Sequence, residues 1–105
     1  MVGGVMFVHT VYFWLREDLT EEQRKAFKEE GIDSLKKIEA AYTVYTGSPA
    51  QTDRPVIDRT YDFGLTVVLE DLQHHDYYQV DPIHKEFVEK FGDYWTKVTI
   101  YDAEG

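Results

Sequence analysis

The chain has 105 residues and a mass of 12.3 kDa, which is below the length of about 150 residues that serves as a prior for one domain. Apolar residues make up 43% of the sequence and aromatic residues 15%, so the chain can fill a core and is not expected to be disordered. Twenty acidic against eleven basic residues give a net charge of −9, which repels nucleic acids and anionic membranes. We expect one globular domain over residues 1–105 that has neither as a partner.

Cysteine is absent, so the sequence offers no disulfide framework, thiolate zinc site or cysteine nucleophile. The longest apolar stretch, residues 5–15, is shorter than the roughly 20 residues that cross a bilayer. No basic segment precedes the first apolar residues, as one would in a signal peptide. These features favour a cytoplasmic location.

Residues 5–15 are rich in β-branched and aromatic side chains and predict a strand that is apolar on both faces. One alternating set of its side chains includes a histidine, and the other is wholly uncharged. The two sets are Phe7, His9, Val11, Phe13 and Leu15, and Met6, Val8, Thr10, Tyr12 and Trp14.

A capping box formed by Thr20 and Gln23 predicts a helix over about residues 21–39. Gly31 lies inside it, where glycine costs about 1 kcal/mol relative to alanine. Two explanations are open: the helix packs closely on the sheet at this point, or the missing side chain leaves room for a ligand.

The rest of the chain predicts three more strands and two short helices. The helix starts are marked by an N-cap aspartate and by an Asp-Pro pair, and Gly92 suits the stop of the second helix. The expected elements are strands at 41–46, 61–69 and 94–101, a loop through Arg59, a helix from Asp71 to about Tyr78, and a helix from Asp81-Pro82 with a core-facing stripe of His84, Phe87, Val88 and Phe91.

The order βαββ(α)αβ predicts an α+β, ferredoxin-like fold, in which helices cover one face of a four-stranded antiparallel sheet. The strand face that carries Tyr12 and Trp14 then has no cover within the monomer. We expect a homodimer that buries this face sheet to sheet as a dimeric α+β barrel, and we expect a charge at Trp14 to dissociate or unfold it.

Three residues are candidates for chemistry. His9 and His84 each interrupt an apolar surface that faces the interior, and Tyr78 precedes His84 across the Pro82 break. Because the strand face and the helix stripe must pack on each other, we expect the three side chains to converge on one partly buried pocket between sheet and helices. Imidazoles in an apolar pocket can transfer protons near neutral pH, and a phenol can hold an oxyanion. The alternative is that all three are satisfied core residues. A cleft of about 300 Å³ or more at His84 would favour ligand chemistry.

His74 and His75 lie among acidic residues, which raises the possibility of a metal site. Adjacent positions on a helix do not share a face, however, and the cluster is typical of a solvated surface. We expect no metal and no cofactor.

Five segments together resemble the stress-responsive A/B barrel (Dabb) family of the dimeric α+β barrel superfamily, over nearly all of residues 5–102. They are HTV at 9–11, LTEEQ at 19–23, YDFGL at 61–65, YQVDPIH at 78–84, and the closing Trp95 with Tyr101-Asp102. The family pattern has a strand histidine and a Tyr-x-x-His-Pro-x-His segment. This sequence has Asp81 at the first histidine of that segment.

The family includes a plant polyketide cyclase that uses a histidine base and a tyrosine. The resemblance implies His84 as general base, with His9 and Tyr78 in support, and it places Gly31 where that enzyme has a tyrosine. Two functions follow as hypotheses. One is a dimeric barrel that binds a small apolar or aromatic molecule; the other is a cofactor-independent lyase, cyclase or monooxygenase acting on a polyketide-like or phenolic substrate.

Overall fold

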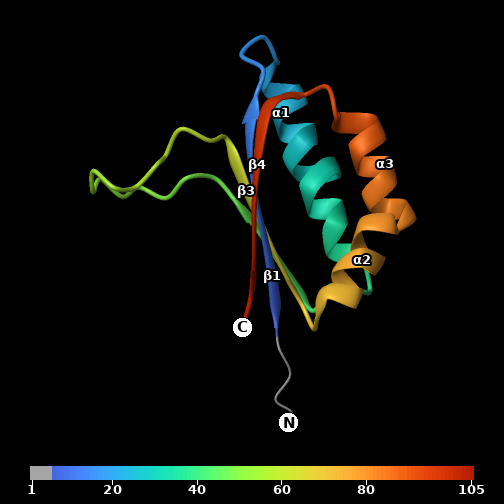
Figure 1. The fold of residues 1–105 in the computed structure, drawn as a ribbon. Coiled ribbons are helices and arrows are strands. Elements are labelled where there is room, and N and C mark those ends of the chain that lie inside the picture. Colours follow the sequence, from blue (N-terminus) through green and yellow to red (C-terminus); the bar gives the residue numbers. More distant parts are fainter. Residues whose placement is uncertain (1–5) are drawn as a thin grey trace.

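The computed structural model describes residues 6–105, which form one sheet covered on one side by helices (Figure 1). All strand pairs are antiparallel and the strand order is β2-β3-β1-β4, which confirms the ferredoxin-like α+β fold. The regular elements are β1 (Phe7–Leu15), α1 (Glu21–Ala26), β2 (Thr43–Gly47), β3 (Phe63–Leu69), α2 (Leu72–Val80), α3 (Pro82–Phe91) and β4 (Trp95–Glu104).

Strand β1 is central and alternates between a buried and a half-buried face. The buried set is the predicted one from Phe7 to Leu15, including His9, and it packs under the helices. Of the opposite set, the residues from Val8 to Trp14 remain half-buried. The strand begins at Phe7, whereas the predicted start at Val5 lies outside the described residues.

The predicted helix over 21–39 forms in three parts rather than one. The capping box at Thr20 and Gln23 is present and starts α1. A wider π-helical turn (η1, Phe27–Gly31) and a tighter 3₁₀ segment (η2, Ile32–Lys37) then follow. The spacing of apolar residues indicates which side of the helix is buried. Over a segment this short it does not distinguish an α-helix from π-helical or 3₁₀ turns, so the sequence did not predict the change of helix type.

Gly31 ends the π-helical turn and packs against α3. A Cβ atom at Gly31 would lie 3.2 Å from Phe87 Cε1 and 3.3 Å from Phe91 Cδ2. The predicted close packing is therefore correct, but its partner is helix α3 rather than the sheet. The two rings occupy the space that a ligand would need here.

Helices α2 and α3 begin as predicted. Asp71 accepts a hydrogen bond from the His74 backbone N–H at 2.9 Å, and Asp81 accepts one from the Ile83 N–H at 2.8 Å. The α3 stripe is correct for Phe87 and Phe91, which are buried, and wrong for Val88, which is 44% exposed. Val88 lies at the edge of the buried face of α3, where its side chain meets solvent.

The other strand boundaries shift by a few residues. Strands β2 and β3 each begin two residues later than predicted, at Thr43 and Phe63, and β4 runs from Trp95 three residues beyond the predicted end, to Glu104. Backbone pairing with β1, which continues as far as Phe7 opposite Glu104, sets that end. Among residues 6–105, no helix is long and apolar enough to span a membrane.

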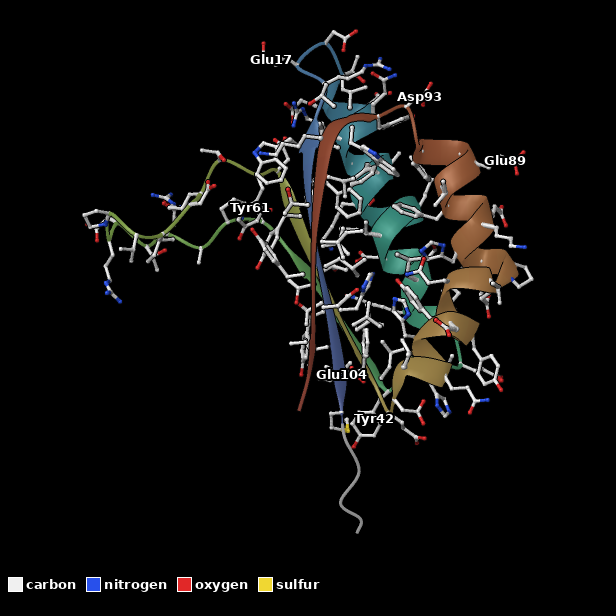
Figure 2. All side chains as sticks on the ribbon, in the orientation of Figure 1. Glu17, Tyr42, Tyr61, Glu89, Asp93 and Glu104 are labelled. Atoms are coloured by element: carbon white, nitrogen blue, oxygen red, sulfur yellow. The ribbon has the colours of Figure 1, made fainter. Side chains whose placement is uncertain are left out.

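Within residues 6–105, no helix covers the face of the sheet opposite the helix layer (Figure 1). The loop over residues 48–62 projects from the sheet on that side, and Tyr61 at its end lies there too (Figure 2). Aromatic side chains gather on this open face: Tyr61 lies 4.7 Å from Tyr12 and 6.4 Å from Trp14, measured between ring centroids. They border a hollow of about 400 Å³.

Candidate functional site

His9 lies on the covered face of the sheet, near the start of strand β1. It is only 3% exposed, and its ring Nδ1 lies 2.6 Å from Asp102 Oδ1. His9 and Asp102 are opposite each other in the pairing of β1 with β4, so the strand register itself brings the carboxylate to the ring. A buried imidazole without a partner costs about 1–3 kcal/mol, and this hydrogen bond removes that cost.

Tyr78 and His84 reach the same region from the helix layer. Tyr78 lies near the end of α2, and His84 lies in the first turn of α3. The Tyr78 ring centroid is 5.9 Å from that of His9 and 5.1 Å from that of His84. The predicted convergence of these three side chains between sheet and helices is therefore confirmed.

The three side chains line a pocket of about 130 Å³ whose other walls are mostly apolar. This is below the volume of about 300 Å³ that would by itself favour ligand chemistry over a filled core. Aromatic rings fill the difference: Trp95 stacks 5.8 Å from Phe87 and lies 5.1 Å from Phe13. An engineered apolar cavity of about 150 Å³ holds benzene, so this pocket fits a molecule of about one ring.

The hydroxyl of Tyr78 is buried and has no hydrogen-bond partner among residues 6–105. Burial raises the pKa of this phenol well above its ordinary value, so the group stays protonated and is a hydrogen-bond donor. An unpaired buried hydroxyl costs about 1–3 kcal/mol. The pocket therefore contains one donor that gains from a polar atom placed beside it.

Burial lowers the pKa of both His9 and His84. At His9 the hydrogen bond and charge of Asp102 work in the opposite direction, and desolvation outweighs them. At His84 the nearby His9 lowers the pKa further, whereas Asp81 raises it. Both rings are neutral at pH 7 and can each accept a proton.

Two further residues, Asp102 and His75, adjoin this group and were not predicted to belong to it. Strand alternation places Asp102 on the same face as Val98 and Ile100, but only the register of β4 with β1 shows that it lies opposite His9. The ring of His75 lies 5.2 Å from that of His9 and 4.7 Å from that of Phe7. Nothing in the local sequence shows that His75 rather than His74 faces the sheet.

The two adjacent histidines of α2 point in different directions, as the helix geometry predicts. His74 stays at the surface, with Nδ1 2.6 Å from Asp71 Oδ1 and Nε2 3.4 Å from Glu70 Oε2. His75 turns toward β1 instead. His74, His75 and the acidic residues around them therefore do not form a single site.

A family model described as Stress responsive A/B Barrel Domain (Dabb) matches residues 7–104. The chain belongs to the Dabb family. Its candidate histidine and tyrosine positions thus lie in a Dabb domain that covers nearly the whole chain. No curated protein matches the sequence.

Solved structures share the fold at low sequence identity. A Dabb family protein from Mesorhizobium loti has 24% identity and a TM-score of 0.77, covering 94% of this chain and 95% of its own. A dimeric ferredoxin-like protein of unknown function from Thermobifida fusca has 16% identity and a TM-score of 0.77, with 95% and 91% covered. A hydroxynitrile lyase from Passiflora edulis has 14% identity and a TM-score of 0.77, with 95% and 93% covered.

We predict that the titration of His9 and His84 shifts in one direction and that of His74 in the other. His9 and His84 should titrate below the ordinary pKa of about 6.5, because burial disfavours their charged forms, and His74 should titrate above it, because Asp71 bonds to its ring. Ring-proton NMR across a pH series measures all three. Because the unfolded chain binds protons more strongly at His9 and His84, their effect is to reduce stability as the pH falls below about 6.5. A pKa above 6.5 at His84 would contradict the buried site.

Proposed function

We propose that this Dabb protein binds a small, mostly apolar molecule with one hydroxyl or carbonyl oxygen in the His9, Tyr78 and His84 pocket. The buried Tyr78 hydroxyl, which lacks a partner within residues 6–105, carries the proposal. The apolar walls favour a ring or short chain, and the volume of about 130 Å³ limits it to about one ring. Neutral His84 can pair with a ligand hydroxyl on the same side.

The ligand test compares para-fluorophenol with fluorobenzene, which differ only in the hydroxyl. Fluorine NMR titration should show tighter binding of the phenol to the native protein. Replacing Tyr78 with Phe should weaken phenol binding by roughly 2–10-fold, which corresponds to one lost hydrogen bond, and leave fluorobenzene unchanged. Tyr77→Phe is the matched control, because Tyr77 is the neighbouring tyrosine and is 52% exposed. Absence of binding by both probes would refute the proposed pocket.

A second candidate function is proton abstraction by His84 in a cofactor-independent lyase, cyclase or monooxygenase that takes a phenolic or polyketide-like substrate. The supporting observation is the pairing of a neutral, half-buried imidazole with a protonated phenol whose ring centroid is 5.1 Å away. Such a pair can remove a proton at one end of a carbonyl compound and stabilise the oxyanion at the other. The Passiflora neighbour is a lyase on this fold.

We expect the enzyme candidate to catalyse exchange of the methyl hydrogens of para-hydroxyacetophenone in deuterated water. His84→Ala should reduce the enzyme-dependent exchange rate at least about 100-fold, the usual contribution of a general base. Its melting temperature should stay near that of the native protein, since a half-buried ring contributes little packing. A loss of exchange that follows unfolding would instead assign His84 a structural role.

We also propose that the protein is a homodimer joined through the open face of the sheet. The half-buried aromatic cluster of Tyr12, Trp14 and Tyr61 lies there, and Tyr101 beside it is 66% exposed. Three structural neighbours, from Thermobifida fusca, Bacteroides fragilis and Jannaschia, are described as dimeric. Burial of this face contributes about 25 cal/mol per Å² of apolar surface.

Tyr101→Glu should convert a dimer of twice 12.3 kDa into a monomer in sedimentation velocity, because it places a charge in the proposed interface. Tyr101 suits the test better than Trp14, whose indole donates to Thr60 Oγ1 at 3.0 Å and supports the protomer itself. Tyr77→Glu makes the same change on the helix layer and should leave the dimer intact. A native protein that sediments as a monomer at micromolar concentration would disprove the dimer.

A further inference from the structure

A group of metal-binding side chains lies beside the pocket, on three different elements. His9 comes from β1, Asp102 from β4 and His75 from α2. One donor atom from each of the three lies within 4.8 Å of the donor atoms of the other two. Ligands of a bound zinc ion are about 3.3 Å apart when the bonds are 2.0–2.2 Å long, so small side-chain rotations bring the three atoms to metal distance.

The surroundings favour a bound cation over a purely structural group. His75 Nδ1 lies 3.2 Å from Asp76 Oδ1, so that carboxylate can hold a proton on Nδ1 and leave the Nε2 lone pair free. Its Nε2 lies 3.5 Å from the side-chain nitrogen of Gln79, which is at most a weak hydrogen bond. His75 thus has a carboxylate of the kind that orients metal-bound histidines, and no strong partner on its other nitrogen among the described residues.

The site also has an entry path and a suitable charge. His9 is almost fully buried, but the side chain of Asp102 is 38% exposed and that of His75 16% exposed, so an ion can reach the group from solvent. The chain carries a net charge of −9, which favours cations. Two imidazoles and one carboxylate suit Zn²⁺ and neighbouring first-row divalent ions rather than Mg²⁺ or Ca²⁺.

From this arrangement we infer that His9, His75 and Asp102 bind one divalent transition-metal ion, with Zn²⁺ as the reference ion. The ion leaves at least one coordination position open, next to the pocket that His9 lines. The hydrogen bond between His9 Nδ1 and Asp102 Oδ1, 2.6 Å long, opens when the metal binds, and the His9 ring keeps its one proton on the nitrogen that does not bind the ion. Metal binding here does not require the proposed ligand, because His75 and Asp102 do not line the pocket.

The test titrates Zn²⁺ into the full chain at pH 7 after treatment with EDTA, by isothermal calorimetry. We expect saturable binding of one ion per chain. His75→Gln and Asp102→Asn should each weaken Zn²⁺ binding by on the order of 100-fold. Replacing a residue that only supports a metal ligand already weakens binding by about 10–100-fold, and a ligand itself should matter at least as much. His74→Gln is the matched control and should bind like the native protein.

A second measurement uses the native sequence and so does not depend on the variants folding. Co²⁺ should broaden the ring signals of His9 and His75 in NMR spectra strongly, and that of His74, which points away from the site, much less. Absence of saturable binding would overturn the inference. Loss of binding in His74→Gln but not in His75→Gln would overturn it as well, since the ion would then occupy the surface cluster of His74, Asp71 and Glu70. Phenol binding by the EDTA-treated protein remains a separate test of the pocket.

Discussion

The structure depends on how the central strand β1 is covered. Every side chain on one of its faces, from Phe7 to Leu15, is buried beneath the helices. The other face, which carries Tyr12 and Trp14, is covered by none of the helices formed by residues 6–105, and Figure 1 shows the helices on one side of the sheet alone. A single helix layer can cover only one side of a sheet, so a strand that is apolar on both faces needs a second layer. The fold of the protomer and the proposed dimer are consequences of the same strand sequence.

His9 is the one ionisable residue on the covered face of β1, and the candidate site forms around it. Its burial requires a partner, which β4 supplies as Asp102 because strand pairing places the two residues opposite each other. The same burial keeps the imidazole neutral by lowering its pKa. The buried His9 imidazole is therefore kept in the neutral form, which can accept a proton or bind a metal ion.

The helix layer determines how large the site can be. Phe87 and Phe91 press against Gly31, and this contact fixes α3 close to η1. With α3 held there, the ring of Phe87 stacks on Trp95 and narrows the pocket to about 130 Å³. The size limit on any ligand therefore comes from aromatic packing, whereas the polar character of the pocket comes from His9, Tyr78 and His84.

The sequence alone determined the fold class, the covered face of β1 and the capped starts of α1, α2 and α3, because these follow from periodicity and from short-range hydrogen bonds. It also brought His9, Tyr78 and His84 to one place, since two buried surfaces that face each other must touch. It did not reveal the π-helical turn before Gly31 or the small volume of the pocket. Both depend on how rings from distant segments pack.

Only the tertiary structure decided the roles of Asp102 and His75. Asp102 is 93 residues from His9 in the chain, and it becomes a neighbour through the register of β1 with β4. His75 follows His74 in sequence, yet one faces the core and the other faces solvent, because successive helical residues point in directions about 100° apart. Local patterns record which side of an element is buried, while the partner met on that side is set by packing between elements.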